Sequence, residues 1–162
     1  MVQVNLEAYW EQEAYERGYI VVAPEVFGLV LRTDAVALLT AVFDWMDTNV
    51  LYDKGRVTLT GASNGGLGAF YAAVAEPGWF GAVVVLPGGY RGPAKDLESL
   101  MGKHVWLLVG GRDVSWKRLA ENTLRALQQA KARASLTVLP GQRHVLRIDP
   151  RRLFDWIEQN TH

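Results

Sequence analysis

Short apolar runs alternate with longer amphipathic segments along this chain, and this alternation constrains the fold more than any other feature. Each run is rich in valine and leucine and is stopped by glycine or proline. Such runs are typical of strands buried on both faces, as in a parallel sheet. The predicted strands cover residues 19–24, 56–61, 82–89, 104–111 and 135–141.

The segments between these runs carry helical signals. Residues 33–50, for example, place apolar side chains at the spacing of one helix face. Because strand and helix alternate, we expect an α/β fold with a mostly parallel sheet of five or six strands and helices on both faces. The 162 residues suit a single domain, 1–162. The predicted helices cover residues 7–17, 33–50, 64–75, 115–132 and 150–160.

Composition narrows the classes of partner. Lys+Arg and Asp+Glu both number 17, so the chain lacks the basic excess of nucleic-acid-binding proteins. It has no cysteine, three well-separated histidines and no HExxH motif, so we expect no metal. The glycine-rich segment GASNGGLG lacks a Walker lysine and the dinucleotide spacing, so we expect no cofactor. No apolar run has the length of a membrane span or a signal-peptide core, and we expect a cytoplasmic protein.

The motif GASNG, residues 61–65, follows a predicted strand and opens a predicted helix. In this context a G-x-S-x-G serine lies on a tight turn, and Gly61 and Gly65 are expected to relieve the crowding around it. The hydroxyl of Ser63 then projects near the positive end of the helix, and the backbone N–H of Asn64 can face a developing oxyanion. The alternative is a turn whose glycines only let the helix pack on the sheet. We interpret Ser63 as a nucleophile.

A serine nucleophile needs a base that takes its proton. His144 follows the last predicted strand, at the sheet edge where functional groups of parallel sheets gather. His104 begins a strand at the opposite edge, and His162 is terminal. His144 is therefore the candidate base.

The base in turn needs an acidic partner that fixes its orientation. Asp113 follows the strand predicted at 104–111 and is the favoured candidate. The alternative role for Asp113 is capping the next helix, which Ser115 could also do. Asp149 and Asp155 are weaker candidates, because Asp149 reads as the start of the last helix.

From about residue 19 to its end, the chain resembles the α/β-hydrolases. The segment RVTLTGASNGGLGAF resembles the nucleophile elbow of small carboxylesterases, VGGRDVSW the acid loop and GQRHVL the histidine loop. The Ser-Asn-Gly-Gly form is similar to that of polyhydroxybutyrate depolymerases and feruloyl esterases, and the phospholipase/carboxylesterase group is also similar. The order Ser63, Asp113, His144 is the one expected of this fold. The resemblance implies ester hydrolysis through an acyl-enzyme, acting on a small-molecule ester.

The start of the chain departs from the family pattern. Family members usually have two or three more strands before the one matching residues 19–24, and the last of these ends in a loop that supplies the second oxyanion donor. Here only MVQVNL precedes the first predicted helix. If it forms a strand, Asn5 or Leu6 would lie where that donor belongs; an ordinary frayed terminus is the alternative. A shortened sheet exposes an edge, so we expect a homo-oligomer, and slow turnover if no donor substitutes.

Two alternatives to an active esterase stay open. One is a weak or inactive hydrolase-fold protein that acts as a binding or assembly module, and the other is part of a longer hydrolase. For the esterase, the candidate substrate-binding residues are Phe27, Tyr90, Trp116 and Val145, each of which could equally be a packing residue. No lid insertion is visible between the predicted strands, so we expect an open site.

Overall fold

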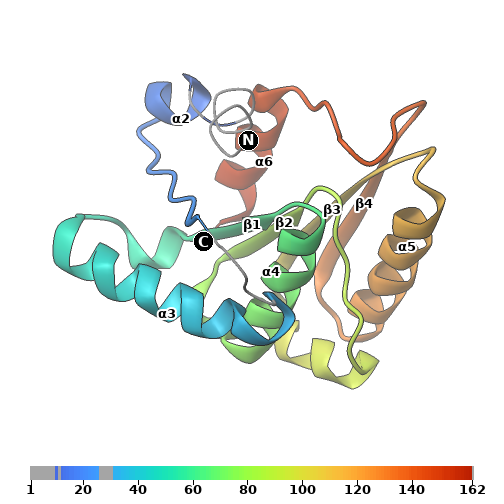
Figure 1. The fold of residues 1–162 in the computed structure, drawn as a ribbon, viewed down its shortest axis with the longest axis horizontal. Coiled ribbons are helices and arrows are strands. Elements are labelled where there is room, and N and C mark those ends of the chain that lie inside the picture. The colour runs from blue at the N-terminus through green and yellow to red at the C-terminus, as the bar shows by residue number, and fades with distance from the viewer. Residues whose placement is uncertain (1–9, 11, 26–30, 162) are drawn as a thin grey trace.

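Four parallel strands form the sheet of the protein (Figure 1). The computed structural model describes residues 10, 12–25 and 31–161. The strands lie in the order β1-β2-β3-β4, so each pairs with its neighbour in the sequence. The α/β class with a parallel sheet is as predicted, with four strands in the described ranges where five or six were expected. The strands are β1 (Thr58–Gly61), β2 (Ala82–Val85), β3 (His104–Gly110) and β4 (Arg133–Leu139).

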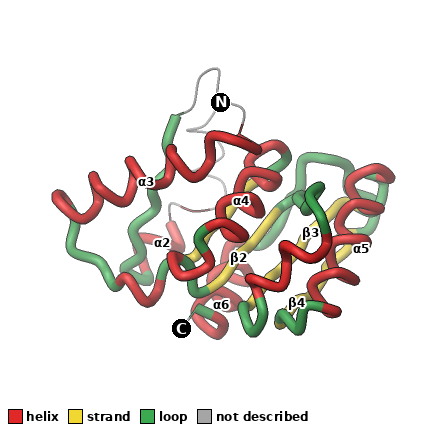
Figure 2. Tube along the Cα trace, turned by 90° about the horizontal axis from the view of Figure 1, so that it is seen from below, coloured by secondary structure: helices red, strands yellow, loops and turns green. Residues whose placement is uncertain are grey.

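Helices cover both faces of this sheet (Figures 1 and 2). Helices α4 and α5 lie on one face and α6 on the other, while the long α3 lies beside α4. Short 3₁₀ turns complete the connections. The α-helices are α2 (Gln12–Glu16), α3 (Leu31–Asn49), α4 (Asn64–Ala75), α5 (Val114–Gln129) and α6 (Pro150–Asn160), and the 3₁₀ turns are η2 (Lys54–Arg56), η3 (Pro77–Trp79) and η4 (Ala94–Leu100).

Burial on both faces explains the continuous apolar runs. Along β2, Val83 and Val85 belong to the core cluster that contains residues of α4 and α5. Val84, between them, belongs to a second cluster that contains Leu153 and Ile157 of α6. Strands β2 and β3 therefore meet an apolar layer on both faces and lack the alternation typical of one-sided sheets, whereas β4 has exposed residues that alternate with partly buried ones over its first half.

The parallel register brings the loops after the strands to one edge of the sheet. Gly61 at the end of β1 pairs with Val85 of β2, and Val85 pairs with Leu107 of β3. Strands β3 and β4 stay paired as far as Gly110 and Leu139. The segments that follow β1, β3 and β4 consequently meet at the carboxyl edge, where open α/β sheets place their ligands.

The predicted strand at residues 19–24 is wrong. Residues 19–25 form no strand, and Ile20, Val21 and Val22 are 49%, 40% and 37% exposed. A groove of about 770 Å³ lies between this segment and β1, and its walls include α3, α4 and α6. Within the described ranges β1 pairs only with β2. Without a neighbouring strand to complete a ladder, an apolar β-branched run does not become a strand. The predicted strand at MVQVNL falls outside the described residues.

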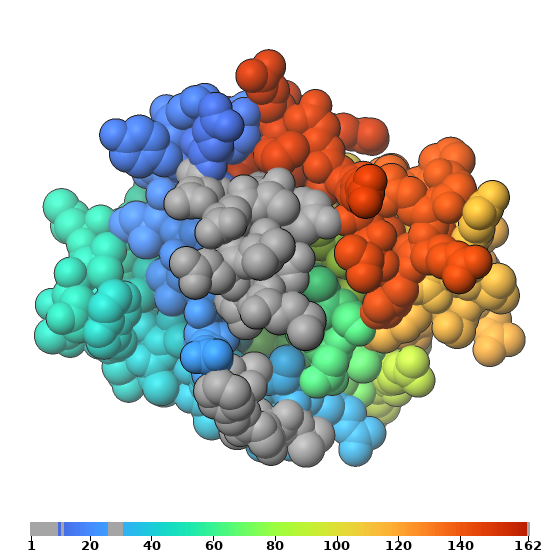
Figure 3. Space-filling model, turned by 45° about the horizontal axis from the view of Figure 1, so that its top comes forward, coloured from blue at the N-terminus to red at the C-terminus, as the bar shows by residue number. Residues whose placement is uncertain are grey.

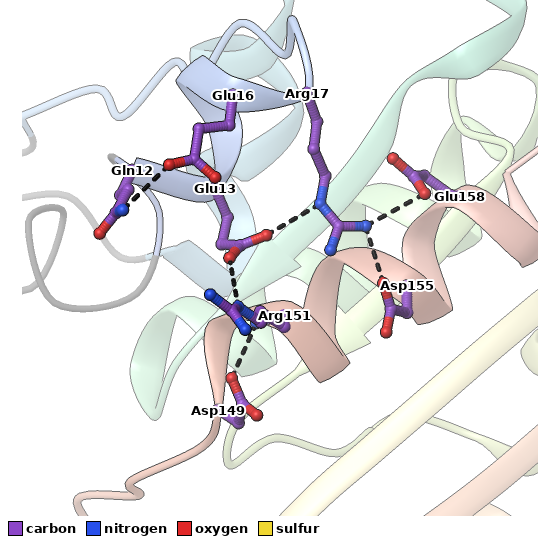
Figure 4. Close-up of polar contacts among 8 residues, drawn as sticks. All are labelled: Gln12, Glu13, Glu16, Arg17, Asp149, Arg151, Asp155 and Glu158. Atoms are coloured by element: carbon purple, nitrogen blue, oxygen red, sulfur yellow. Dashed lines mark hydrogen bonds and ion pairs between the residues drawn. The ribbon is translucent and has the colours of Figure 1, made fainter.

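A cluster of charged residues attaches α2 to α6 (Figure 4). The guanidinium of Arg17 contacts Glu13 at 2.9 Å, Asp155 at 2.8 Å and Glu158 at 3.1 Å. Glu13 also contacts Arg151 at 3.2 Å, which adds a second link between the helices. The space-filling view shows the two helices against each other, α2 in blue and α6 in red (Figure 3). None of the helices in the described ranges combines the length and apolarity needed to cross a membrane.

Candidate active site

Ser63 occupies the turn between β1 and α4. Its backbone has φ 56° and ψ −118°, a positive φ that side-chain-bearing residues adopt at a cost of about 1–3 kcal/mol. The Ser63 N–H donates to the carbonyl of Pro87 at 2.7 Å, and Leu67 N–H donates to the Ser63 carbonyl at 3.1 Å. The turn is therefore fixed from the neighbouring loop and from the first turn of α4. Ser63 stands at the helix N-cap position without using its side chain as a cap, so the hydroxyl is available for other contacts.

Two glycines, Gly61 and Gly66, make this turn possible, whereas the sequence predicted Gly61 and Gly65. A Cβ on Gly61 would overlap the carbonyl of Gly65, so Gly61 has the predicted role. A Cβ on Gly65 would meet nothing within 4 Å, so relief of crowding at Gly65 is not what this turn requires. The second crowded position is Gly66, whose Cβ would overlap the carbonyl of Pro87. The close approach is between the start of α4 and the loop after β2.

The side chains of Ser63, His144 and Asp113 form one hydrogen-bonded chain. His144 Nε2 lies 2.8 Å from Ser63 Oγ, and His144 Nδ1 lies 2.6 Å from Asp113 Oδ2. His144 is 31 positions from Asp113 and 81 positions from Ser63, and the three residues meet because the strands that precede them, β4, β3 and β1, run parallel in one sheet. The imidazole is 42% exposed and the carboxylate 10%, so the acid is shielded while the base faces the surface.

The geometry distinguishes between the two roles considered for Asp113. Asp113 stands at the N-cap position of α5, but its side chain makes no capping hydrogen bond and contacts His144 instead. The two rival acids have other partners. Asp149 accepts from the N–H of Arg151 at the start of α6, and Asp155 pairs with Arg17.

The predicted oxyanion donor, the backbone N–H of Asn64, belongs to the described chain. Asn64 is the first residue of α4, and the N–H of a first helical residue has no acceptor inside its helix. It directly follows Ser63, as the predicted role requires. Asn5 and Leu6, the candidates for the second donor, lie outside the described residues, and so does Phe27.

The remaining substrate-binding candidates lie in different surroundings. The ring of Trp116 is half-buried and lies 5.3 Å from the ring of His144. Val145 is 77% exposed beside the histidine. Tyr90 is buried in the core against Phe70 and Tyr71.

The buried hydroxyl of Tyr90 has a polar partner. It donates to Asp96 at 2.8 Å, and burial together with this bond raises the pKa of Tyr90 above its ordinary value. The Tyr90 N–H donates to Thr123 of α5 at 2.9 Å. These contacts fix the loop after β2, which also holds the Ser63 N–H through Pro87.

Sequence reasoning did not identify Arg91. Its guanidinium lies 5.9 Å from the centroid of the Trp116 ring. The available signal was its position, directly after Tyr90 in a loop at the carboxyl edge of the sheet. Nowhere in the described ranges do histidine and acidic side chains gather in a group that could hold a metal ion.

Residues 36–148, more than half of the chain, match the family model described as "Putative esterase". The chain belongs to this esterase family. The matched region contains Ser63, Asp113 and His144. A search of curated proteins found no match.

Solved structures share the α/β-hydrolase fold of this chain. An uncharacterized protein from Bacillus cereus ATCC 10987 has a TM-score of 0.79 at 14% identity, over 98% of this chain and 55% of that one. A carboxylesterase from Mesorhizobium loti has a TM-score of 0.65 at 17% identity, over 79% and 61%. A thermostable esterase has a TM-score of 0.67 at 17% identity, over 78% and 36%. The chain thus corresponds to between 36% and 61% of the length of these proteins.

Proposed function

We propose that the protein is a serine hydrolase that cleaves carboxylic esters of small molecules through an acyl-enzyme. The observation that carries the proposal is the hydrogen-bonded chain from Ser63 through His144 to Asp113, with the serine on a strained turn at a helix N-terminus. Membership of the esterase family supports the same reaction class.

In the first half of the reaction, Ser63 Oγ attacks the ester carbonyl while its proton passes to His144 Nε2. Asp113 accepts from Nδ1, holds the imidazole in the productive orientation and stabilises its protonated form. The N–H of Asn64 faces the oxyanion. Collapse of the tetrahedral intermediate breaks the ester C–O bond, and the proton on His144 leaves with the alcohol.

In the second half, His144 takes a proton from water, and the resulting hydroxide attacks the acyl-serine. The C–O bond to Ser63 breaks, the proton returns to Ser63 and the carboxylic acid leaves. The 42% exposure of the imidazole leaves room for this water to reach it. No oxidant, metal or cofactor enters the balance.

Labelling with a fluorophosphonate probe and peptide mapping tests the nucleophile, with p-nitrophenyl acetate and butyrate turnover measured alongside. Labelling should occur at Ser63 and vanish in Ser63→Ala together with turnover. Ser115→Ala, which changes an exposed serine at the start of α5, is the matched control and should keep both. Turnover that survives in Ser63→Ala would refute the proposal.

A second candidate function is a hydrolase-fold binding or assembly module. The side of β1 that has no partner strand among the described residues lies beside a groove of about 770 Å³, and this favours it. This candidate predicts a folded protein that the probe does not label at Ser63, so the same experiment separates the two functions.

A further inference from the structure

Arg91 lies next to the candidate active site through an aromatic contact. Its guanidinium is 5.9 Å from the centroid of Trp116, and that ring is 5.3 Å from the ring of His144. The two distances together limit the separation of guanidinium and imidazole to about 11 Å. A group held by Arg91 is therefore within reach of a short molecule whose ester lies at Ser63.

The charge of Arg91 is not neutralised by any acid in the described ranges. The guanidinium lies over the ring of Trp116, no ion pair joins it to an acid there, and the side chain is exposed. Asp96, the next acid along the chain, lies in η4 and accepts from the hydroxyl of Tyr90. A guanidinium carries several N–H donors, so contact with an indole leaves donors available to a ligand. The contact with the ring also restricts the side chain, which reduces the entropy lost on binding.

The neighbours of the other site residues are also cationic. Arg112 precedes Asp113 and Arg143 precedes His144, and both arginines are exposed. Neither side chain forms an ion pair in the described part of the chain. The carboxylate of Asp113 is 10% exposed and directed at the histidine. Three exposed arginines therefore lie on loops at this edge, although the formal net charge of the whole chain is zero. A local positive field raises the concentration of anionic substrates.

We propose that the ester substrate carries a carboxylate group, and that Arg91 binds this carboxylate. The proposal rests on the proposed function, since Ser63 must cleave the ester. The substrate class is a monoester of a short dicarboxylic acid, in which a few methylene groups separate the free carboxylate from the scissile carbonyl. Arg91 forms charge-assisted hydrogen bonds with the carboxylate, which takes no part in the chemistry. Hydrolysis releases the dicarboxylic acid and the alcohol.

The test compares two esters that differ only in charge. Mono-p-nitrophenyl glutarate and mono-p-nitrophenyl adipate carry the free carboxylate, and the methyl p-nitrophenyl diesters of the same acids are their neutral controls. The measured quantity is the ratio of kcat/KM for the acidic ester to kcat/KM for the neutral ester. The wild-type protein should favour the acidic ester, and the preference should weaken as salt is raised.

Arg91→Gln should lower this ratio about fivefold or more, mainly through KM, as fits hydrogen bonds to a charged group at an exposed site. Arg91→Lys, which keeps the charge without the planar guanidinium, should give a ratio between those of the wild type and Arg91→Gln. Arg118→Gln on α5 removes another exposed arginine and should leave the ratio unchanged.

Other results would contradict either the role of Arg91 or the proposed function. A wild-type ratio near one, or an equal loss for both esters in Arg91→Gln, overturns the assignment of Arg91. If the neutral diesters are hydrolysed without a preference for charge, only this inference fails. If neither ester is hydrolysed and Ser63 is not labelled, the proposed function itself fails.

Discussion

At the scale of single residues, the elbow depends on glycine at two crowded positions and tolerates a side chain at a third. A methyl group on Gly61 meets the backbone of Gly65, which cannot rotate away as a side chain would. Gly61→Ala should therefore lower the free energy of unfolding by about 2 kcal/mol, the usual cost of overpacking, and abolish labelling of Ser63. Urea unfolding and the fluorophosphonate probe measure the two effects.

Gly65→Ala is the matched control for that change. Its Cβ meets nothing within 4 Å, and alanine favours the helix in which residue 65 lies. The free energy of unfolding should stay the same or rise by about 0.5 kcal/mol. Equal destabilisation by the two substitutions would contradict the structure of the turn described above.

Tyr90 gives a prediction on alkaline pH. Burial, then the hydrogen bond to Asp96, raises the pKa of Tyr90 above its unfolded value of 10.0. The folded protein thus keeps the phenolic proton more tightly than the unfolded chain, so this contribution is complete below about pH 10 and decreases as pH rises above it. Tyr90→Phe should lower stability by about 1 kcal/mol at neutral pH. The difference from wild type should narrow above pH 10 in urea titrations; a constant difference would contradict this account.

The residue scale also shows how far the sequence determined the candidate site. Ser63, Asp113 and His144 could be named because each lies in a loop directly after an apolar strand, and parallel strands bring such loops together. The choice between capping and orienting for Asp113 needed a tertiary contact, its 2.6 Å approach to His144. The contact of Arg91 with Trp116 joins the loop after β2 to the first turn of α5 without any local sequence pattern, so the sequence did not predict it.

At the scale of elements, α4 and α6 begin and end where the sequence predicted; Pro77 follows the end of α4, and Pro150 is the first residue of α6. The segment at 19–24 failed for a different reason. Its composition was that of a strand, but a strand also needs a paired neighbour, and pairing is a property of the assembled sheet rather than of six residues. Sequence patterns therefore predicted which segments are apolar, but they did not predict which of these segments pair in the sheet.

The attachment of α2 to α6 gives an element-scale prediction. Arg17 reaches Glu13, Asp155 and Glu158 and lies over the ring of Phe154, and its loss leaves the largely shielded Glu13 with Arg151 alone. Arg17→Met should therefore lower the thermal unfolding midpoint clearly.

Lys54→Met is the control for the attachment of α2. Lys54 pairs with Asp47 between two well-exposed side chains, and such pairs contribute little to stability. Its substitution should leave the midpoint almost unchanged. Similar shifts for the Arg17 and Lys54 variants would show that the ion cluster does not hold α2 in place.

At the scale of the whole molecule, the unpaired side of β1 in the described ranges is a candidate surface for self-association. Within the described ranges this strand has a partner on one side only, and Ile20, Val21 and Val22 expose apolar surface along the facing groove. Exposed strand edges and contiguous apolar surface are both associated with pairing between chains. We therefore predict that the protein self-associates through this edge.

Light scattering coupled to size exclusion tests this prediction, since one chain has a mass of 18.0 kDa and an oligomer a multiple of it. Ile20→Lys places a charge at the groove and should shift the protein toward the mass of one chain without unfolding it. Tyr15→Lys is the control, because Tyr15 is 87% exposed on α2 and does not line the groove. A wild-type protein with the mass of one chain would contradict the prediction. Dissociation by Tyr15→Lys but not by Ile20→Lys would place the interface on α2 instead, away from the open edge of β1.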